Sequence, residues 1–95
     1  MILGRVIGNV VSVIKDSSYR DFKLLVVQEL NLDGSFNNNF YISADLIGVG
    51  TDEVVLITVG TSSRATKETF EKPIDSVIIA KIDKLIFENS EIDIY

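Results

Sequence analysis

The feature that most constrains the fold of this chain is an alternating apolar pattern near its start that leaves both faces of one strand apolar. Residues 2–15 predict a β-strand, because apolar side chains recur at every second position. Leu3 and Ile7 fall on one face of this strand, and Ile2 and Val6 fall on the other. We therefore expect one face to meet the core of the domain and the other to meet a second layer or another subunit.

Two glycines interrupt this strand four residues apart. Gly4 and Gly8 fall on the same face, where a missing side chain allows a sharp bend or the close approach of a neighbouring backbone. The Gly-x-x-x-Gly spacing also occurs where transmembrane helices pack against each other, but here no apolar run of about 20 residues surrounds it. We expect a soluble, cytoplasmic protein with no membrane contact.

Four further segments contain the residue types of β-strands and are bounded by turn-forming residues. They are residues 23–29, a segment that resumes at Phe40–Ile42, residues 53–59 and residues 76–87. Asp33 and Gly34 predict a hairpin turn, because a left-handed backbone suits both residue types. Asn37–Asn39 are expected to extend the loop after this turn, and the alternating segment 91–95 predicts a terminal strand that pairs with its own sheet or with a neighbour's.

The segment between the last two of these strands predicts a short helix over residues 61–70. Thr61 or Ser62 can cap it, and Pro73 prevents much extension. Five strands and one short helix in this order favour an all-β fold, a small five-stranded OB-like β-barrel with one short helix, although the pattern is also compatible with a sandwich.

The length of 95 residues predicts a single domain, residues 1–95. A chain of this size builds a modest core, so self-association is a natural way to bury more surface. The chain has no cysteine and no histidine, which removes disulfides, thiolate chemistry, the usual zinc and haem ligands and the commonest general base. We expect no cofactor, no metal and no enzymatic activity.

Two motifs with possible chemistry have simpler structural explanations. Gly48-Val49-Gly50 begins like a dinucleotide-binding fingerprint, but its third glycine is missing and a strand follows, so a tight loop with a positive φ angle is the better interpretation. Ser62 and Ser63 have no histidine to activate them, and they suit a turn in which hydroxyl groups cap the backbone. No spacing among the carboxylates selects a catalytic pair.

Nucleic-acid binding is the alternative that an OB-like barrel raises. Single-strand binders of this fold combine aromatic stacking platforms with basic grooves. The net charge of −5 repels phosphate backbones on average, and few lysines or arginines separate the aromatic residues. We expect no nucleic-acid partner, and the aromatic residues are better used in core or interface packing.

Several stretches together resemble the EutN/CcmL family of bacterial microcompartment vertex proteins. Residues 4–11 match its opening Gly-x-Val-x-Gly-x-Val-Val pattern, and residues 23–27 match a Lys-Leu-Leu-Val-Val segment. Residues 45–50, 52–56 and 60–64 fall on an Asp-x-Val-Gly-Ala-Gly loop, a Gly-Glu-x-Val-Leu strand and a Gly-Ser-Ser-Ala-Arg turn. The chain departs from these patterns at Ile47, Val49, Asp52, Thr61 and Ser63.

The resemblance implies a structural protein that is not an enzyme. It implies a homopentamer of OB-like barrels that caps the vertices of a polyhedral shell in the cytoplasm and contacts hexameric shell proteins. It also implies that the subunit interface, or an axial pore, is lined by two segments, whose residues are Gly48, Gly50, Gly60, Thr61, Ser62, Ser63 and Arg64. The alternatives from other functional classes are an OB-fold protein that binds single-stranded nucleic acid and a small enzyme subunit.

Overall fold

The structure of the chain is a computed structural model, and it describes residues 1–11, 23–60 and 76–95. These residues form seven β-strands: β1 (Ile2–Asn9), β2 (Lys23–Leu30), β3 (Phe36–Asp45), β4 (Val54–Val59), β5 (Ser76–Lys81), β6 (Leu85–Phe87) and β7 (Ser90–Ile92). The helix predicted over residues 61–70 lies outside the described residues.

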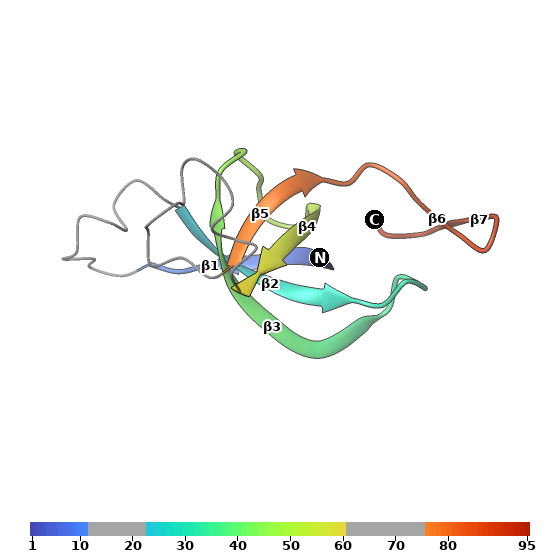
Figure 1. The fold of residues 1–95 in the computed structure, drawn as a ribbon, viewed down its shortest axis with the longest axis horizontal. Coiled ribbons are helices and arrows are strands. Elements are labelled where there is room, and N and C mark those ends of the chain that lie inside the picture. The colour runs from blue at the N-terminus through green and yellow to red at the C-terminus, as the bar shows by residue number, and fades with distance from the viewer. Residues whose placement is uncertain (12–22, 61–75) are drawn as a thin grey trace.

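Strands β1 to β5 form a closed barrel in the order β1-β2-β3-β5-β4 (Figure 1). Neighbouring strands are antiparallel except β3 and β5, which run parallel and pair at Ala44↔Val77 and Asp45↔Ile78. The hydroxyl groups of Ser43 and Ser76, both buried, share a hydrogen bond of 2.5 Å beside this short parallel seam. The predicted all-β, five-stranded barrel is confirmed.

Two predicted boundaries in the first half of the chain are wrong. The first strand ends at Asn9, whereas the alternating pattern predicted a strand to Lys15, and Val10 and Val11 lie outside it. Asn37–Asn39, expected in a loop, lie inside β3. They lie in a register shift that is enclosed by the pairs Leu30↔Phe36 and Gln28↔Phe40 with β2, and the side-chain amide of Gln28 donates to the carbonyl oxygen of Asn37 at 2.9 Å.

The turn at Asp33 and Gly34 is confirmed, although positive φ is limited to Gly34, at 90°. The Asp33 carboxylate instead accepts the backbone N–H of Ser35 at 2.9 Å. The segment 76–87 forms two strands instead of the predicted one, because the chain leaves the barrel after Lys81. The last barrel contact there is a hydrogen bond from the N–H of Ile82 to the carbonyl of Val54, at 2.8 Å.

Residues 82–95 form a separate unit, which we call the C-terminal arm. Within it β6 pairs antiparallel with β7 in a two-stranded sheet. The predicted terminal strand at 91–95 is therefore shorter than expected, and its last three residues pack against the barrel without being part of a strand.

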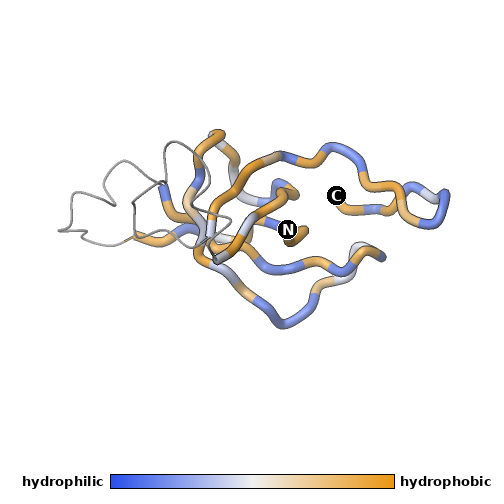
Figure 2. The backbone as a smooth tube through the Cα atoms, in the orientation of Figure 1, coloured by the Kyte–Doolittle hydropathy of each residue, from blue (hydrophilic) through white to orange (hydrophobic). Residues whose placement is uncertain are grey.

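The barrel interior holds the main hydrophobic core. Successive side chains of a strand point to opposite faces, so each strand can contribute residues to the interior. Figure 2 shows that apolar residues recur along the strands. The members of this core are almost fully buried: Val6, Leu25, Val27, Val49, Val55, Ile57 and Ile78. Each such side chain contributes about 1.5–3 kcal/mol by leaving water.

A second core lies outside the barrel, between the β1–β4 pair and the C-terminal arm. Leu3 and Val54 pack there against Ile94 of the arm, and Val54 and Ile94 are buried. The expectation that β1 is covered on both faces is confirmed for Leu3, where the second layer is the chain's own arm. It is not met at Ile7, whose side chain is 40% exposed.

The two glycines of β1 have different surroundings. A Cβ atom on Gly4 would lie 2.4 Å from Cγ1 of Val27 and 2.9 Å from the carbonyl oxygen of Gln28, so β2 approaches too closely for any side chain. On Gly8 the nearest atom would be 4.0 Å away, and the register shifts between Val6 and Gly8. Gly4 therefore permits close approach, and Gly8 accompanies a bulge.

We predict that Gly4→Ala destabilises the protein and that Gly8→Ala does not. The clash at Gly4 involves backbone as well as a buried side chain, so overpacking should lower the free energy of unfolding by about 1–3 kcal/mol. Gly8→Ala should change it by less than about 1 kcal/mol. Urea denaturation of both variants measures the difference, and equal stability would contradict this explanation of Gly4.

Candidate functional site

The loop between β3 and β4 is organised around one carboxylate. Asp45, at the end of β3, accepts backbone N–H groups from Ile47, Gly48 and Val49, at 3.0, 2.9 and 2.9 Å. A short carboxylate that can accept several hydrogen bonds suits such a local turn. The loop conformation is therefore set by its own first residue.

The glycines of this loop have distinct roles. Gly48 has a φ angle of 81° and open space where a Cβ would stand, so its backbone conformation explains the glycine. That conformation turns Val49 into the barrel core, where it is 4% exposed. Gly50 has no positive φ, and its N–H donates to the carboxylate of Glu53 at 3.1 Å. The tight loop predicted for Gly48-Val49-Gly50 is confirmed, with positive φ at Gly48.

The second half of the loop is fixed to β1. The N–H of Asp52 donates to the carbonyl of Val6 at 2.7 Å, and the N–H of Val6 donates to the carbonyl of Glu53 at 3.0 Å. Asp52 has a φ angle of 71°, a left-handed conformation that favours glycine. The left-handed conformation explains why the family pattern has glycine at this position. In this chain Asp52 adopts the conformation instead.

Glu53 connects the loop to β5 through an ion pair. Its Oε2 lies 3.1 Å from Nζ of Lys81. The hydrogen bond from Lys81, followed by that from Gly50, lowers the pKa of the Glu53 carboxyl below its usual value, and the hydrogen bond to Glu53 raises the pKa of Lys81. Both shifts favour the charged pair in the folded state.

We predict that Glu53→Gln removes a pH-dependent part of the stability. Because the folded-state pKa of Glu53 is below 4.5, its stabilisation is fully present above that pH and is lost as the pH falls through the folded value. The variant should therefore melt at a lower temperature than the original protein at pH 7, and the difference should vanish once the pH has fallen below the folded-state pKa of Glu53. Melting curves across this range test the assignment, and a constant difference at all pH values would contradict it.

We predict that Asp52→Gly leaves the stability unchanged or raises it, whereas Asp52→Val lowers it. A branched residue in a left-handed conformation costs about 1–2 kcal/mol, and glycine has no such cost. Thermal unfolding of the two variants separates the cases. Tolerance of valine at this position would rule out the conformational explanation.

The sequence-based site candidates do not form one cluster in the described residues. Gly48 and Gly50 lie in the β3–β4 loop, whereas Gly60 follows the other end of β4. The length of β4, about 20 Å, separates the loop from Gly60. Gly60 has a φ angle of 67° and no atom within 4 Å of an added Cβ. Thr61, Ser62, Ser63 and Arg64 lie outside the described residues.

Sequence reasoning missed how firmly the C-terminal arm is anchored. The Tyr95 hydroxyl donates to the carbonyl of Ile82 at 2.6 Å and accepts the N–H of Val54 at 3.1 Å. The Arg5 guanidinium donates to the carbonyl of Ile94 and lies 5.5 Å from the ring centre of Phe36. The one signal for this arrangement is the alternation Ile92, Ile94 in a polar tail ending in tyrosine.

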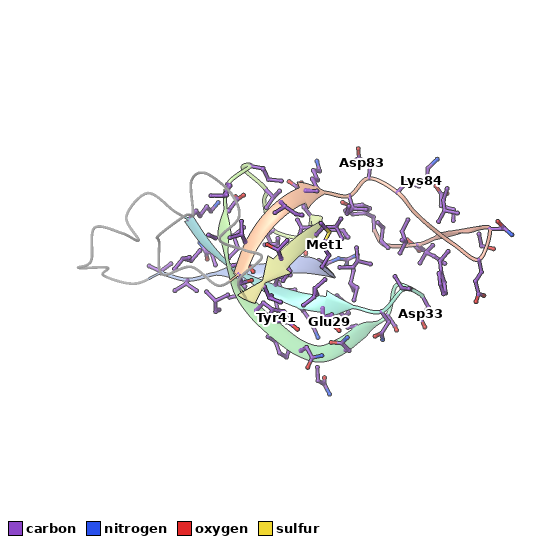
Figure 3. All side chains as sticks on the ribbon, viewed as in Figure 1. Met1, Glu29, Asp33, Tyr41, Asp83 and Lys84 are labelled. Atoms are coloured by element: carbon purple, nitrogen blue, oxygen red, sulfur yellow. The ribbon has the colours of Figure 1, made fainter. Side chains whose placement is uncertain are left out.

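The β2–β3 hairpin closes on the same arm. A Cβ on Gly34 would lie 2.7 Å from the carbonyl oxygen of Asp93, so the hairpin tip touches the arm backbone. At the base of the hairpin the Tyr41 hydroxyl donates to Glu29 at 3.1 Å, and burial, followed by this contact, raises the pKa of Tyr41. Figure 3 shows Glu29 and Tyr41 on this hairpin and Asp83 and Lys84 on the arm.

The chemistry of the described surface is modest. A shallow, open depression runs along the arm, lined by Asp83, Lys84 and residues 91–95. Within residues 1–11, 23–60 and 76–95, no group of three acidic side chains is placed to hold a metal ion. The same residues contain no helix that could cross a membrane.

Comparison with known proteins identifies the family. The family model described as "Ethanolamine utilisation protein EutN/carboxysome" matches residues 1–83. The chain belongs to the EutN/CcmL family. The carboxysome shell vertex protein CcmL of Synechococcus elongatus is 38% identical over 92 residues, which cover 97% of this chain and 93% of the relative.

Solved structures of EutN/CcmL proteins have the same fold. CcmL of Gloeobacter violaceus superposes with a TM-score of 0.90 at 34% identity, covering 96% of this chain and 94% of that one. The pentameric microcompartment shell protein GrpN of Rhodospirillum rubrum superposes with a TM-score of 0.83 at 32% identity, covering 92% and 99%. The family consists of structural shell vertex proteins and not of enzymes, so the chain is a shell vertex protein.

Proposed function

We propose that this protein forms a homopentamer that closes the vertices of a bacterial microcompartment shell. The observation that carries the proposal is the similarity to shell vertex proteins over nearly the whole chain, including the pentameric GrpN. The function is then geometric. Each barrel contacts the next at a fixed angle, and the contact closes after five copies.

A head-to-tail contact explains why such a ring can close. Two different surfaces of one subunit meet in a heterologous interface, and rotation by one fifth of a turn brings the fifth copy back to the first. Hexagonal tiles alone form flat layers, so closed shells need pentagonal units at their corners. We propose hexameric shell proteins as the partners around the rim of the ring.

We further propose that residues 1–95 act as one vertex domain and that two of its segments contribute to the subunit interface or to an axial pore. These segments contain Gly48, Gly50, Gly60, Thr61, Ser62, Ser63 and Arg64. Support comes from the β3–β4 loop, which is rigid enough to present a fixed surface. Its backbone is held by Asp45 from within and by Val6 of β1 from outside.

Single-strand binding by the barrel remains the alternative function, and the charge of the chain argues against it. The net charge is −5, so neutralising phosphates would need a local cationic groove. We propose that the protein has no nucleic-acid partner. Salt-dependent binding of a single-stranded oligonucleotide at 50 mM salt would favour the alternative instead.

Native mass spectrometry tests the pentamer directly. We expect the dominant species to have five times the 10.5 kDa mass of the chain. A protein that stays monomeric at micromolar concentration and above would contradict the proposal.

We predict that Gly60→Val weakens the ring and that Gly60→Asn preserves it. Gly60 has a φ angle of 67°, which asparagine tolerates and a branched residue resists by about 1–2 kcal/mol. The valine variant should shift the turn after β4 and release monomers in native mass spectra. An intact pentamer in the valine variant would show that this turn is not part of the interface.

A further inference from the structure

Two apolar surfaces of the described chain belong to none of its three hydrophobic clusters. The first, which we call the β3 patch, lies on the outer face of the barrel and consists of Val26, Phe40 and Ile42. Phe40 and Ile42 are 55% and 50% exposed, and Val26 stands directly opposite Ile42 across the strand pair. Gly8 pairs with Val26 on its other side and has no side chain to cover the patch at this position.

The second surface is one face of the tip of the C-terminal arm, formed by Ile86 of β6, whose side chain is 64% exposed. Phe87, the next residue of the strand, points to the opposite face of the ribbon. A two-stranded ribbon is marginally stable by itself. This ribbon is anchored at its base by Tyr95 and Ile82, whereas its tip extends away from the barrel (Figure 1).

The two surfaces lie on different parts of the molecule, as a head-to-tail ring requires. In Figure 1 the β6–β7 ribbon projects beyond one end of the barrel, and β3 curves along another side. Each subunit would thus offer a projecting apolar tip and a separate apolar face. A heterologous contact joins two such unlike surfaces from neighbouring copies.

Charge makes the β3 patch a suitable site for this tip. The arm carries Asp83, Glu88, Glu91 and Asp93 against the single cation Lys84, which pairs with Glu91 at 3.5 Å, so the arm is net negative and acidic surface repels it. The outward positions of β2 and β3 around the patch contain no carboxylate, since they are Leu24, Val26, Gln28, Asn38, Phe40 and Ile42. An acidic tip therefore meets no like charge in these rows.

The area of this contact is that of a small part of a larger subunit interface. A phenylalanine side chain offers about 150–250 Å² when fully accessible, so the exposed half of Phe40 presents roughly 100 Å². A stable interface buries about 800 Å² on each partner. The tip and the patch supply its apolar centre, which is where binding energy concentrates.

We propose that the arm tip of one subunit packs on the β3 patch of the next subunit in the ring. This inference rests on the proposed function, because the occupant of the patch is a second copy of this chain. Ile86 meets Phe40 and Ile42, and the contact repeats around the ring.

Cysteine cross-linking tests the contact without interference, because the chain has no cysteine of its own. Phe40→Cys and Ile86→Cys are placed in separate chains that carry tags of different size, and the chains are co-expressed and oxidised. A disulfide that joins the two tags can arise only between subunits. We expect at least ten times more of it than from the control pair Leu32→Cys with Ile86→Cys, since Leu32 is 52% exposed but lies at the hairpin turn outside the patch.

The double variant with both cysteines in one chain should give a covalent ladder that stops at five chains. If native mass spectrometry finds pentamers but the patch and control pairs cross-link equally little, the inference is overturned and the proposed function stands. If the original protein is a monomer, both the proposed function and this inference are contradicted.

A matched pair of charge substitutions gives an independent readout. Ile42→Asp places a carboxylate in the patch, and Leu32→Asp places one at an equally exposed position outside it. We expect Ile42→Asp to lower the pentamer fraction at least tenfold at a given concentration and Leu32→Asp to leave it unchanged, with the barrel melting cooperatively in both. Intact pentamers in Ile42→Asp would overturn the proposal.

Discussion

The rest of the structure depends on the pairing of β1 with β4, which is buried on both sides. Inward residues such as Val6 and Ile57 fill the barrel, and outward residues Leu3 and Val54 are covered by the C-terminal arm. Gly4 lets β2 approach this pair closely enough to complete the closed sheet. One two-sided strand pair thus connects the barrel to the arm, and a change on either face affects both.

A vertex protein needs rigid surfaces at a fixed angle more than it needs a reactive group. The β3–β4 loop provides such a surface, because Asp45 orders its first half and hydrogen bonds with Val6 hold its second half. The arm is fixed by Tyr95 and Arg5 at its base. In the proposed ring, subunits held in this way would meet at a fixed angle, so that five copies close instead of forming an open helix.

The sequence predicts the barrel well because strand periodicity, turn residues and family motifs agree over most of its length. It fails where tertiary structure overrides local preference: Asn37–Asn39 lie in β3 between flanking residues that pair with β2, and the chain leaves the barrel after Lys81 although its residues favour continued strand. The positive φ of Gly48 follows from its motif, whereas the positive φ of Asp52 was not predicted, although the family pattern has glycine at that position. The anchoring of the arm depends on residues about 40 to 90 positions apart, and the alternation of Ile92 and Ile94 in the tail does not identify these partners.

The central claim is that copies of this barrel close a shell that hexameric tiles cannot close alone. The most direct measurement is electron microscopy of particles formed by hexameric shell proteins of the same organism, with and without this protein. The account predicts closed polyhedral particles with density at the five-fold corners when the protein is present, and sheets, tubes or particles with open corners when it is omitted. Sealed corners in its absence, or empty corners in its presence, would contradict the account.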